Sequence, residues 1–173
     1  MAGAEAADQA AAPIIREGRD DDAEQLIELI GSCFAEYPGC VMDVDGELPE
    51  LRAIASAYRE KYGRFWVAEE GGKVIGCVGV VPCRRLPGME LQKLYVSKES
   101  RRRGLAARLC GLVEDEARAE GAEFVELWSD TRFEAAHRLY ESLGYVCGPL
   151  TRALHDKSNS VERFFRKLLD PSR

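Results

Sequence analysis

The sequence predicts a single α/β domain in which a mixed β-sheet is flanked by helices. Its 173 residues are enough for one domain with a sizeable core, and 46% of them are hydrophobic. Apolar segments at 65–69, 74–81 and 89–96 are joined by short turns, which favours antiparallel pairing. The strand, helix and strand between 89 and 128 favour a parallel crossover instead. One sheet that contains both kinds of pairing accommodates both patterns.

The N-terminal segment is predicted to be a disordered leader, residues 1–12, before a single domain at 13–169. The leader is rich in alanine, carries Glu5 and Asp8 but no basic residue, and lacks the apolar centre of a signal peptide. A short strand at 14–19 follows it. Asp20–Asp22 then supply an N-cap and an acidic first turn for a helix.

Two helices are predicted before the first hairpin. The first has apolar residues at helical spacing, and these are Leu26, Ile27, Ile30 and Phe34. Tyr37-Pro38-Gly39 ends it, and a loop runs to Pro49. The second helix, which ends near Gly63, carries the apolar residues Leu51, Ile54, Ala55 and Tyr58.

The rest of the chain alternates between strands and helices. Gly71-Gly72 makes a hairpin turn between 65–69 and 74–81, and a third strand covers 89–96. The later elements are a helix from Gly104 to Gly121, a strand at 124–128, a helix at about 132–143, a strand from Tyr145 and a last strand at 161–168. Three basic residues in 161–168 would also fit a terminal helix, so that alternative stays open.

Composition excludes several classes of function. The formal net charge of −6 argues against a nucleic-acid partner, and no apolar run is long enough to cross a bilayer. The six cysteines form no C-x-x-C pair, which argues against a zinc or other metal site. Reduced thiols in a cytoplasmic protein are the simplest interpretation, with Cys77 and Cys110 as buried structural thiols.

The segment from Leu91 to Ala106 predicts an anion site. A strand leads into the turn Arg101-Arg102-Arg103-Gly104, and a strongly periodic helix begins there. Backbone N–H groups at a helix start have no intrahelical partner, and the helix dipole adds positive charge. A phosphate or pyrophosphate group is the expected ligand.

Two motifs in this chain resemble those of the GCN5-related N-acetyltransferase (GNAT) family. Arg101-x-x-Gly104-x-Ala106 resembles its acyl-CoA-binding signature, and the segment 136–145, AHRLYESLGY, resembles its later signature A-x-x-L-Y-x-x-x-G-F/Y. The resemblance covers 14–168. It implies a centrally splayed sheet and acetyl transfer from acetyl-CoA to an amine by direct attack, without a metal.

The resemblance also implies where acetyl-CoA binds. The pyrophosphate would accept hydrogen bonds from the turn amides, where Gly104 lets phosphate oxygens approach the backbone. The pantetheine arm would pair with the backbone of Leu94 and Val96. The predicted cofactor residues are Leu94, Tyr95, Val96, Arg101, Arg102, Arg103, Gly104, Leu105 and Ala106. For each arginine side chain, a solvated position is an equal alternative.

Tyr140 and Glu90 are the predicted catalytic residues. Tyr140 matches the family tyrosine that protonates the departing thiolate, although a core tyrosine in an apolar stripe would look the same. Glu90 aligns with a glutamate that some members use as general base, or it is an ordinary strand-edge residue. Gln92 lies on the same strand face. Phe133 stands where many members have an asparagine that helps to hold the cofactor.

Several polar residues near the predicted site have competing interpretations. Asp130 is predicted to cap the helix that follows it, and His137 to lie off the apolar face of that helix. His155 is a loop residue with a capacity for base chemistry, but exposure alone also explains it. Carboxylates at 43–47 are either solvated or attract a cationic substrate.

The acceptor is the least determined part of the prediction. A small-molecule amine is the first choice because the sequence shows no extended peptide-recognition feature, and a protein N-terminus or lysine is second. A regulatory module that binds acyl-CoA without turnover is the alternative from another class. A homodimer is compatible with the sequence.

Overall fold

The computed structural model describes residues 12–170, so the predicted leader lies outside the described residues except for Ala12. Its helices are α1 (Ala23–Phe34), α2 (Val44–Glu47), α3 (Ile54–Glu60), α4 (Leu105–Ala119) and α5 (Glu134–Ser142). Its strands are β1 (Ile14–Glu17), β2 (Arg64–Glu70), β3 (Lys73–Pro82), β4 (Gly88–Val96), β5 (Phe124–Asp130), β6 (Val146–Ala153) and β7 (Val161–Leu168).

The strands form one seven-stranded sheet in the order β1-β2-β3-β4-β5-β7-β6. Only β4 and β5 pair in parallel, and the other neighbours are antiparallel, which confirms the predicted mixed sheet. One buried cluster packs the sheet against α4 and α5, and a second packs it against α1 and α3. The last segment is strand β7, so the alternative of a terminal helix is wrong.

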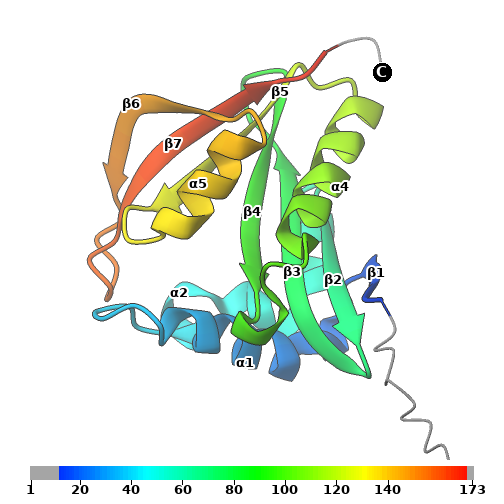
Figure 1. The fold of residues 1–173 in the computed structure, drawn as a ribbon, viewed down its shortest axis with the longest axis vertical. Coiled ribbons are helices and arrows are strands. Elements are labelled where there is room, and N and C mark those ends of the chain that lie inside the picture. Colours follow the sequence, from blue (N-terminus) through cyan, green and yellow to red (C-terminus); the bar gives the residue numbers. More distant parts are fainter. Residues whose placement is uncertain (1–11, 171–173) are drawn as a thin grey trace, which may run out of the picture.

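The sheet is splayed at its centre. β4 and β5 pair only where Gly88–Glu90 lie beside Phe124–Glu126. Beyond that point β4 stays with β3 as far as Val96, while β5 stays with β7 as far as Asp130. Figure 1 shows the two strands diverging downward from their shared end, with α5 in front of the gap. The backbone edge of β4 that faces this gap has no strand partner from Leu91 onward.

A β-bulge in β4 sets which side chains face the gap. The register of β3 and β4 shifts between Cys77 and Gly79, so Lys93 and Leu94 lie opposite one residue of β3. Lys93 has a φ of 51°, a left-handed conformation that recurs in such bulges. The extra residue reverses the alternation along the strand. Leu94 therefore packs in the α4 cluster, and Tyr95 packs in the α1 cluster.

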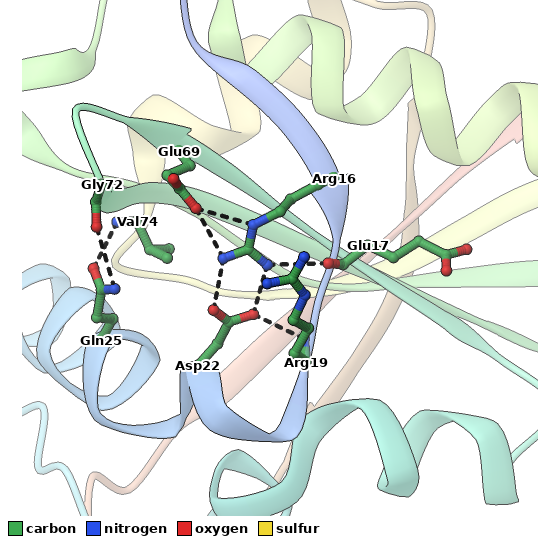
Figure 2. Close-up of polar contacts among 8 residues, drawn as sticks. All are labelled: Arg16, Glu17, Arg19, Asp22, Gln25, Glu69, Gly72 and Val74. Atoms are coloured by element: carbon green, nitrogen blue, oxygen red, sulfur yellow. Dashed lines mark hydrogen bonds and ion pairs between the residues drawn. The ribbon is translucent and has the colours of Figure 1, made fainter.

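A polar network fixes the N-terminal strand to the sheet. Arg16 donates from Nε to Glu69 at 3.0 Å and from its two other nitrogens to Asp22 at 2.9 and 2.8 Å. Figure 2 shows Asp22 between this guanidinium and the backbone of Arg19, whose N–H it accepts at 2.8 Å. Asp22 is only 4% exposed, so its charge depends on these donors.

Several element boundaries differ from those predicted. The loop before Pro49 contains the short helix α2, and residues 49–53 form a 3₁₀ turn before α3. β3 continues through Pro82 instead of ending before it. α5 begins at Glu134 and its N-cap is Phe133, so the prediction that Asp130 caps this helix is wrong. Asp130 instead accepts from the Arg132 N–H at 2.8 Å and orders the turn before the helix.

Candidate active site

The turn before α4 presents a run of free backbone amides. Those of Arg102 to Ala107 have no backbone acceptor within residues 12–170. Arg102 and Gly104 both have left-handed conformations, with φ of 61° and 74°. Amides in such a turn point into a common concavity that suits an anion, and a helix N-terminus adds positive potential. A Cβ on Gly104 would meet no atom within 4 Å, so the turn is open to solvent at this position.

Two of the three arginine side chains in this turn are engaged within the protein. Arg101 forms a bidentate pair with Glu36 at 2.7 and 2.6 Å and donates from Nε to the Val96 carbonyl at 3.1 Å. Arg103 forms a bidentate pair with Glu70 at 3.0 and 2.6 Å. These bonds raise the pKa of both guanidinium groups. The backbone of the turn is therefore the part most available to a ligand, and the exposed Arg102 side chain has no hydrogen bond or ion pair within residues 12–170.

An apolar groove leads from this turn along β4. Its volume is about 180 Å³, and it is lined by Cys33, Tyr37, Leu94, Tyr95, Val96, Arg101, Ala106, Phe133, Ala135, Ala136 and Leu139. The edge of β4 that has no strand partner lies along this groove. An extended ligand that contains amide groups could form hydrogen bonds with that edge. Phe133 packs on Tyr37 with ring centroids 4.7 Å apart, so an aromatic wall replaces the amide that an asparagine would offer.

A larger cleft of about 520 Å³ adjoins the groove. Leu94, Tyr95, Phe133 and Ala136 line both spaces. The cleft opens where β4 and β5 part, and its polar lining residues are Glu47, Glu50, Lys61, Glu90, Gln92, Lys93, Ser129, Asp130, Arg152, Asp156, Ser158, Ser160 and Glu162. A ligand in the groove and a second ligand in the cleft would meet at the residues that the two spaces share.

Tyr140 stands in the wall of the cleft. Its side chain is 5% exposed, and its ring packs 5.9 Å from Tyr145 and 5.6 Å from Phe165. Burial raises the pKa of Tyr140, so the phenol is protonated at neutral pH. Its hydroxyl has no hydrogen-bond partner among residues 12–170. The hydroxyl oxygen is not fully buried, so it is accessible from the cleft. A proton donor facing a cleft has these properties.

Glu90 belongs to a hydrogen-bonded chain that begins in the core. Tyr58 is 1% exposed and donates to Gln92 Oε1 at 3.0 Å. Gln92 Nε2 then donates to Glu90 Oε1 at 2.9 Å. Gly79 lies opposite Gln92, and a Cβ there would lie 2.7 Å from the Tyr58 hydroxyl oxygen. The tyrosine can therefore reach Gln92 only because position 79 has no side chain.

Two loops that are distant in sequence join across the mouth of the cleft. The Ser158 hydroxyl accepts from the Val41 N–H at 2.8 Å, Lys157 N–H donates to Glu47 at 2.7 Å, and Lys157 Nζ pairs with Asp43 at 2.6 Å. We call these contacts between 41–47 and 157–158 the clasp. Figure 1 shows the orange β6–β7 loop meeting the blue loop before α2 at the lower left. Glu47 and Ser158 of the clasp line the cleft together with Asp130, the last residue of β5.

Both histidine predictions can be compared with the structure. The prediction that His137 lies off the apolar face is wrong, because it is 8% exposed and its Nε2 is 3.1 Å from Ser129 Oγ. Burial lowers the pKa of His137, which favours the neutral ring. His155 is exposed and does not line the cleft. Asp130 lines it but is paired with Arg132, whose bonds lower the pKa of Asp130 against the opposing effect of burial.

Three residues in or next to the site were not recognised from the sequence. Tyr58 was assigned only to a helix core, Glu50 was not considered, and Glu126 lies directly beside Glu90 in the parallel pairing. Glu126 accepts from Arg166 at 2.6 Å, and Glu50 pairs with Lys93 at 2.5 Å. Alternation along β5 could have placed Glu126 on the face of Glu90, but only the strand register brings them together.

Cys77 and Cys110 are both buried, as predicted. Within residues 12–170, no group of three or more histidine, cysteine, aspartate or glutamate side chains could hold a metal ion. Among the helices of the same residues, none has both the length and the hydropathy needed to cross a membrane. The cytoplasmic location and the homodimer stay predictions.

The chain is similar to known acetyltransferases. The model of the "Acetyltransferase (GNAT) family" matches residues 23–145. Probable N-acetyltransferase family 8 member 5 of Mus musculus is 34% identical over 121 residues, which are 68% of this chain and 51% of that protein. The chain thus spans about half the length of the first curated relatives that it matches.

Solved structures share its fold. An acetyltransferase of the GNAT family from Staphylococcus aureus Mu50 superposes with a TM-score of 0.79 at 23% identity, over 92% of this chain and 100% of that one. The yncA protein of Salmonella typhimurium, solved with acetyl-CoA, gives a TM-score of 0.69 at 21% identity, over 92% and 95% of the two chains. At these identities the likeness concerns the fold alone.

Proposed function

The chain belongs to the acetyltransferase (GNAT) family, and from that premise we propose that it transfers an acetyl group from acetyl-CoA to a primary amine on a small molecule. One observation carries this proposal. The turn of free amides, the apolar groove along the unpaired edge of β4 and the polar cleft follow one another, and Tyr140 stands in the cleft wall next to residues that line both spaces.

The residues of the site fit acetyl-CoA as cosubstrate. The amides of 102–106 would hold the pyrophosphate, and the backbone of Leu94 and Val96 would bind the pantetheine arm. Leu105, the first residue of α4, is buried and anchors the turn, while Ala106 lines the groove. Acetyl-CoA supplies an acetyl thioester, whose carbonyl carbon is open to attack by a neutral amine. Tyr95 contributes a wall between groove and cleft.

The chain's own catalytic groups handle protons. We assign Glu90 as the base that takes a proton from the substrate ammonium, with Gln92 fixing one carboxylate oxygen. We assign the Tyr140 hydroxyl as the acid that donates a proton to the leaving sulfur. The C–N bond forms as the C–S bond breaks, and no covalent enzyme intermediate is needed. Holding both substrates together reduces the entropic part of the barrier.

A small acceptor is favoured over a protein chain. The clasp forms part of the cleft wall, and the cleft volume of about 520 Å³ is typical of small-molecule sites. Acetylation of peptides in preference to free amines would contradict this part of the proposal.

The Tyr140→Phe variant tests the proposed reaction. With acetyl-CoA and a panel of amines, release of free CoA thiol should fall by about 10²–10⁴-fold in kcat, while acetyl-CoA binding persists. Tyr145→Phe is the matched control, because its ring packs against Tyr140 but does not line the cleft.

Two results would contradict the proposal in different ways. Wild-type protein that binds acetyl-CoA but turns over no amine would indicate an acyl-CoA-binding module. Turnover that survives Tyr140→Phe would leave the enzyme but remove Tyr140 as its acid.

A further inference from the structure

The proton balance of the proposed reaction leaves one proton without an acceptor. A primary ammonium has three N–H bonds, and the amide product keeps one of them. Glu90 is assigned to take one of the two protons that leave. Tyr140 begins protonated, so it cannot receive the other before it has given its own proton to the sulfur. A second proton acceptor beside the attacking nitrogen would complete the balance.

A serine–histidine pair in the cleft wall has the chemistry for this step. Ser129, the last residue but one of β5, lines the cleft and is 6% exposed. Its Oγ lies 3.1 Å from Nε2 of His137, and the hydroxyl has no other hydrogen bond within residues 12–170. A hydroxyl that bonds a neutral imidazole can take a proton on its oxygen while it passes its own to the ring.

Helix α5 places this pair next to the proposed acid. His137 and Tyr140 are the buried residues of α5. Three residues of an α-helix rise about 4.5 Å, so the two side chains leave the same face of α5 slightly less than one turn apart. Ser129 and Tyr140 both line the cleft. The hydroxyl that His137 holds is therefore in the space where the amine would meet the thioester.

The surroundings of His137 keep its ring neutral, as a proton acceptor must be. Burial lowers the pKa of His137, and the charge of Arg163, which lies opposite Ser129 on β7, acts in the same direction. A hydrogen bond with the Asp130 backbone and the charges of Glu141 and Asp130 raise that pKa, but they are outweighed. The imidazole is therefore free to accept a proton at neutral pH.

We propose that Ser129 is a further catalytic residue, which relays the second proton from the acceptor nitrogen to His137; this rests on the proposed function. As the C–N bond forms, a nitrogen proton moves to Ser129 Oγ and the serine proton moves to His137 Nε2. The C–S bond then breaks, and the Tyr140 proton goes to the sulfur. Of the protons left on Glu90 and His137, one restores Tyr140 and the other leaves to solvent.

Three variants separate proton transfer from packing. Ser129→Ala removes the hydroxyl, Ser129→Thr keeps one, and His137→Gln keeps a polar group that can bond Ser129 but takes up no proton. CoA thiol release is measured with saturating acetyl-CoA and a panel of primary amines that includes butylamine, hexylamine and benzylamine. We expect kcat to fall about 10²-fold in Ser129→Ala and in His137→Gln, and Ser129→Thr to keep most of the activity.

The acetyl-CoA KM should stay unchanged in all three variants, and calorimetric titration of acetyl-CoA confirms that each is folded. Ser32→Ala is the matched control, because the Ser32 hydroxyl bonds within α1 and lines neither the groove nor the cleft.

The pH profile of kcat gives a readout that a structural role would not move. His137 accepts a proton only as the neutral ring, so wild-type kcat should fall as the pH drops through the lowered pKa of His137, below the ordinary histidine value of about 6.5. His137→Gln should lose this limb of the profile. In mixtures of light and heavy water, wild-type kcat should depend non-linearly on the deuterium fraction, because two protons move together.

Each contrary result has a distinct meaning. Wild-type kcat in His137→Gln would overturn the relay, since hydrogen bonding without proton uptake would suffice. A linear dependence of wild-type kcat on deuterium fraction would overturn it without any variant. Acetylated Ser129 in rapidly quenched wild type, detected by mass spectrometry, would make the serine a nucleophile instead. These results leave the acetyltransferase proposal intact, whereas no turnover with any amine would overturn that proposal and the relay with it.

Discussion

Single residues determine how Glu90, the proposed base, is held. Glu90 is only partly buried, so its position depends on what fixes it. Gln92 can rotate its amide, and either end could face the carboxylate. The Tyr58 hydroxyl removes that ambiguity, because it donates to the amide oxygen and leaves the nitrogen to face Glu90. A fully buried tyrosine thus acts on the site without contacting a substrate.

Tyr58→Phe should separate this positioning role from a purely structural one. The loss of one hydrogen bond should lower the free energy of unfolding by about 1 kcal/mol. It should also lower kcat more than it raises the acetyl-CoA KM, since Gln92 no longer orients Glu90. Steady-state kinetics and urea unfolding measure the two effects. Gln92→Ala should reproduce the kinetic defect, and unchanged kcat in both variants would show that Glu90 needs no orienting partner.

The sequence predicted the candidate catalytic residues but not the residues that position them. Tyr140 and Glu90 could be proposed from motif position, because the chemistry requires those residue types there. Tyr58 could not, because its apolar spacing is satisfied by a core role. Its hydroxyl acquires a function only through Gly79, which comes beside it when β3 pairs with β4.

Among the elements, the turn before α4 combines two kinds of constraint. Its backbone must stay open for a ligand, and its conformation must still be fixed. The pairs Arg101–Glu36 and Arg103–Glu70 provide the fixation from both sides, by tying the turn to the end of α1 and to β2. Arg101 and Arg103 therefore mainly stabilise the conformation of the turn through ion pairs within the protein. The charge pattern of the sequence alone could not show this.

Gly104→Ala tests whether this backbone binds the cosubstrate. A left-handed φ of 74° costs alanine about 1 kcal/mol of stability. We also expect the acetyl-CoA KM to rise about tenfold, which corresponds to a weakened charge-assisted hydrogen bond. Gly121→Ala at the other end of α4 is a close control, with a φ of 73° and no atom within 4 Å of its Cβ. Equal KM values in the two variants would argue against an anion at Gly104.

The link between β1 and α1 predicts a pH dependence of stability. Burial opposes the charge of Asp22, but the Arg16 and Arg19 hydrogen bonds outweigh it and lower the pKa of Asp22. A lowered folded-state pKa stabilises the protein above the unfolded pKa of about 3.9, and this contribution is lost as the pH falls through the folded value. Asp22→Asn should therefore cost about 2 kcal/mol at neutral pH and progressively less below pH 4.

Urea unfolding of wild type and variant at pH 7, 5 and 3 measures this difference. Asp21→Asn is the control, because Asp21 is exposed and its side chain has no hydrogen bond or ion pair within residues 12–170. A wild-type–variant gap that stays constant down to pH 3 would contradict the assignment of the charge to this network.

At the scale of the whole molecule, the fold was more predictable than the site. Apolar patterning located β2 to β5, because burial against helices imposes it. The exposed β6 has no such pattern, and the segment of β7 was also compatible with a helix. The clasp was not predictable, since it depends on contacts between loops more than a hundred residues apart. Loop residues such as Ser158 carry no periodic signal, and their conformations are set by what the rest of the molecule brings near them.

Ser158→Ala tests whether the clasp determines the acceptor site. Ser158 is 7% exposed, and its hydroxyl is the acceptor for the Val41 N–H. Removing it should cost about 1–3 kcal/mol and speed hydrogen exchange at the Val41 amide, because that donor loses its partner. The amine KM should rise, whereas the acetyl-CoA KM should not, since the groove along β4 lies outside the clasp. Ser142→Ala, which removes an exposed hydroxyl bonded within α5, is the matched control.

If both KM values rose together, the loops would support the whole molecule rather than the acceptor end. If neither KM rose, the bound amine would lie away from the clasp, and the clasp would not determine the acceptor site.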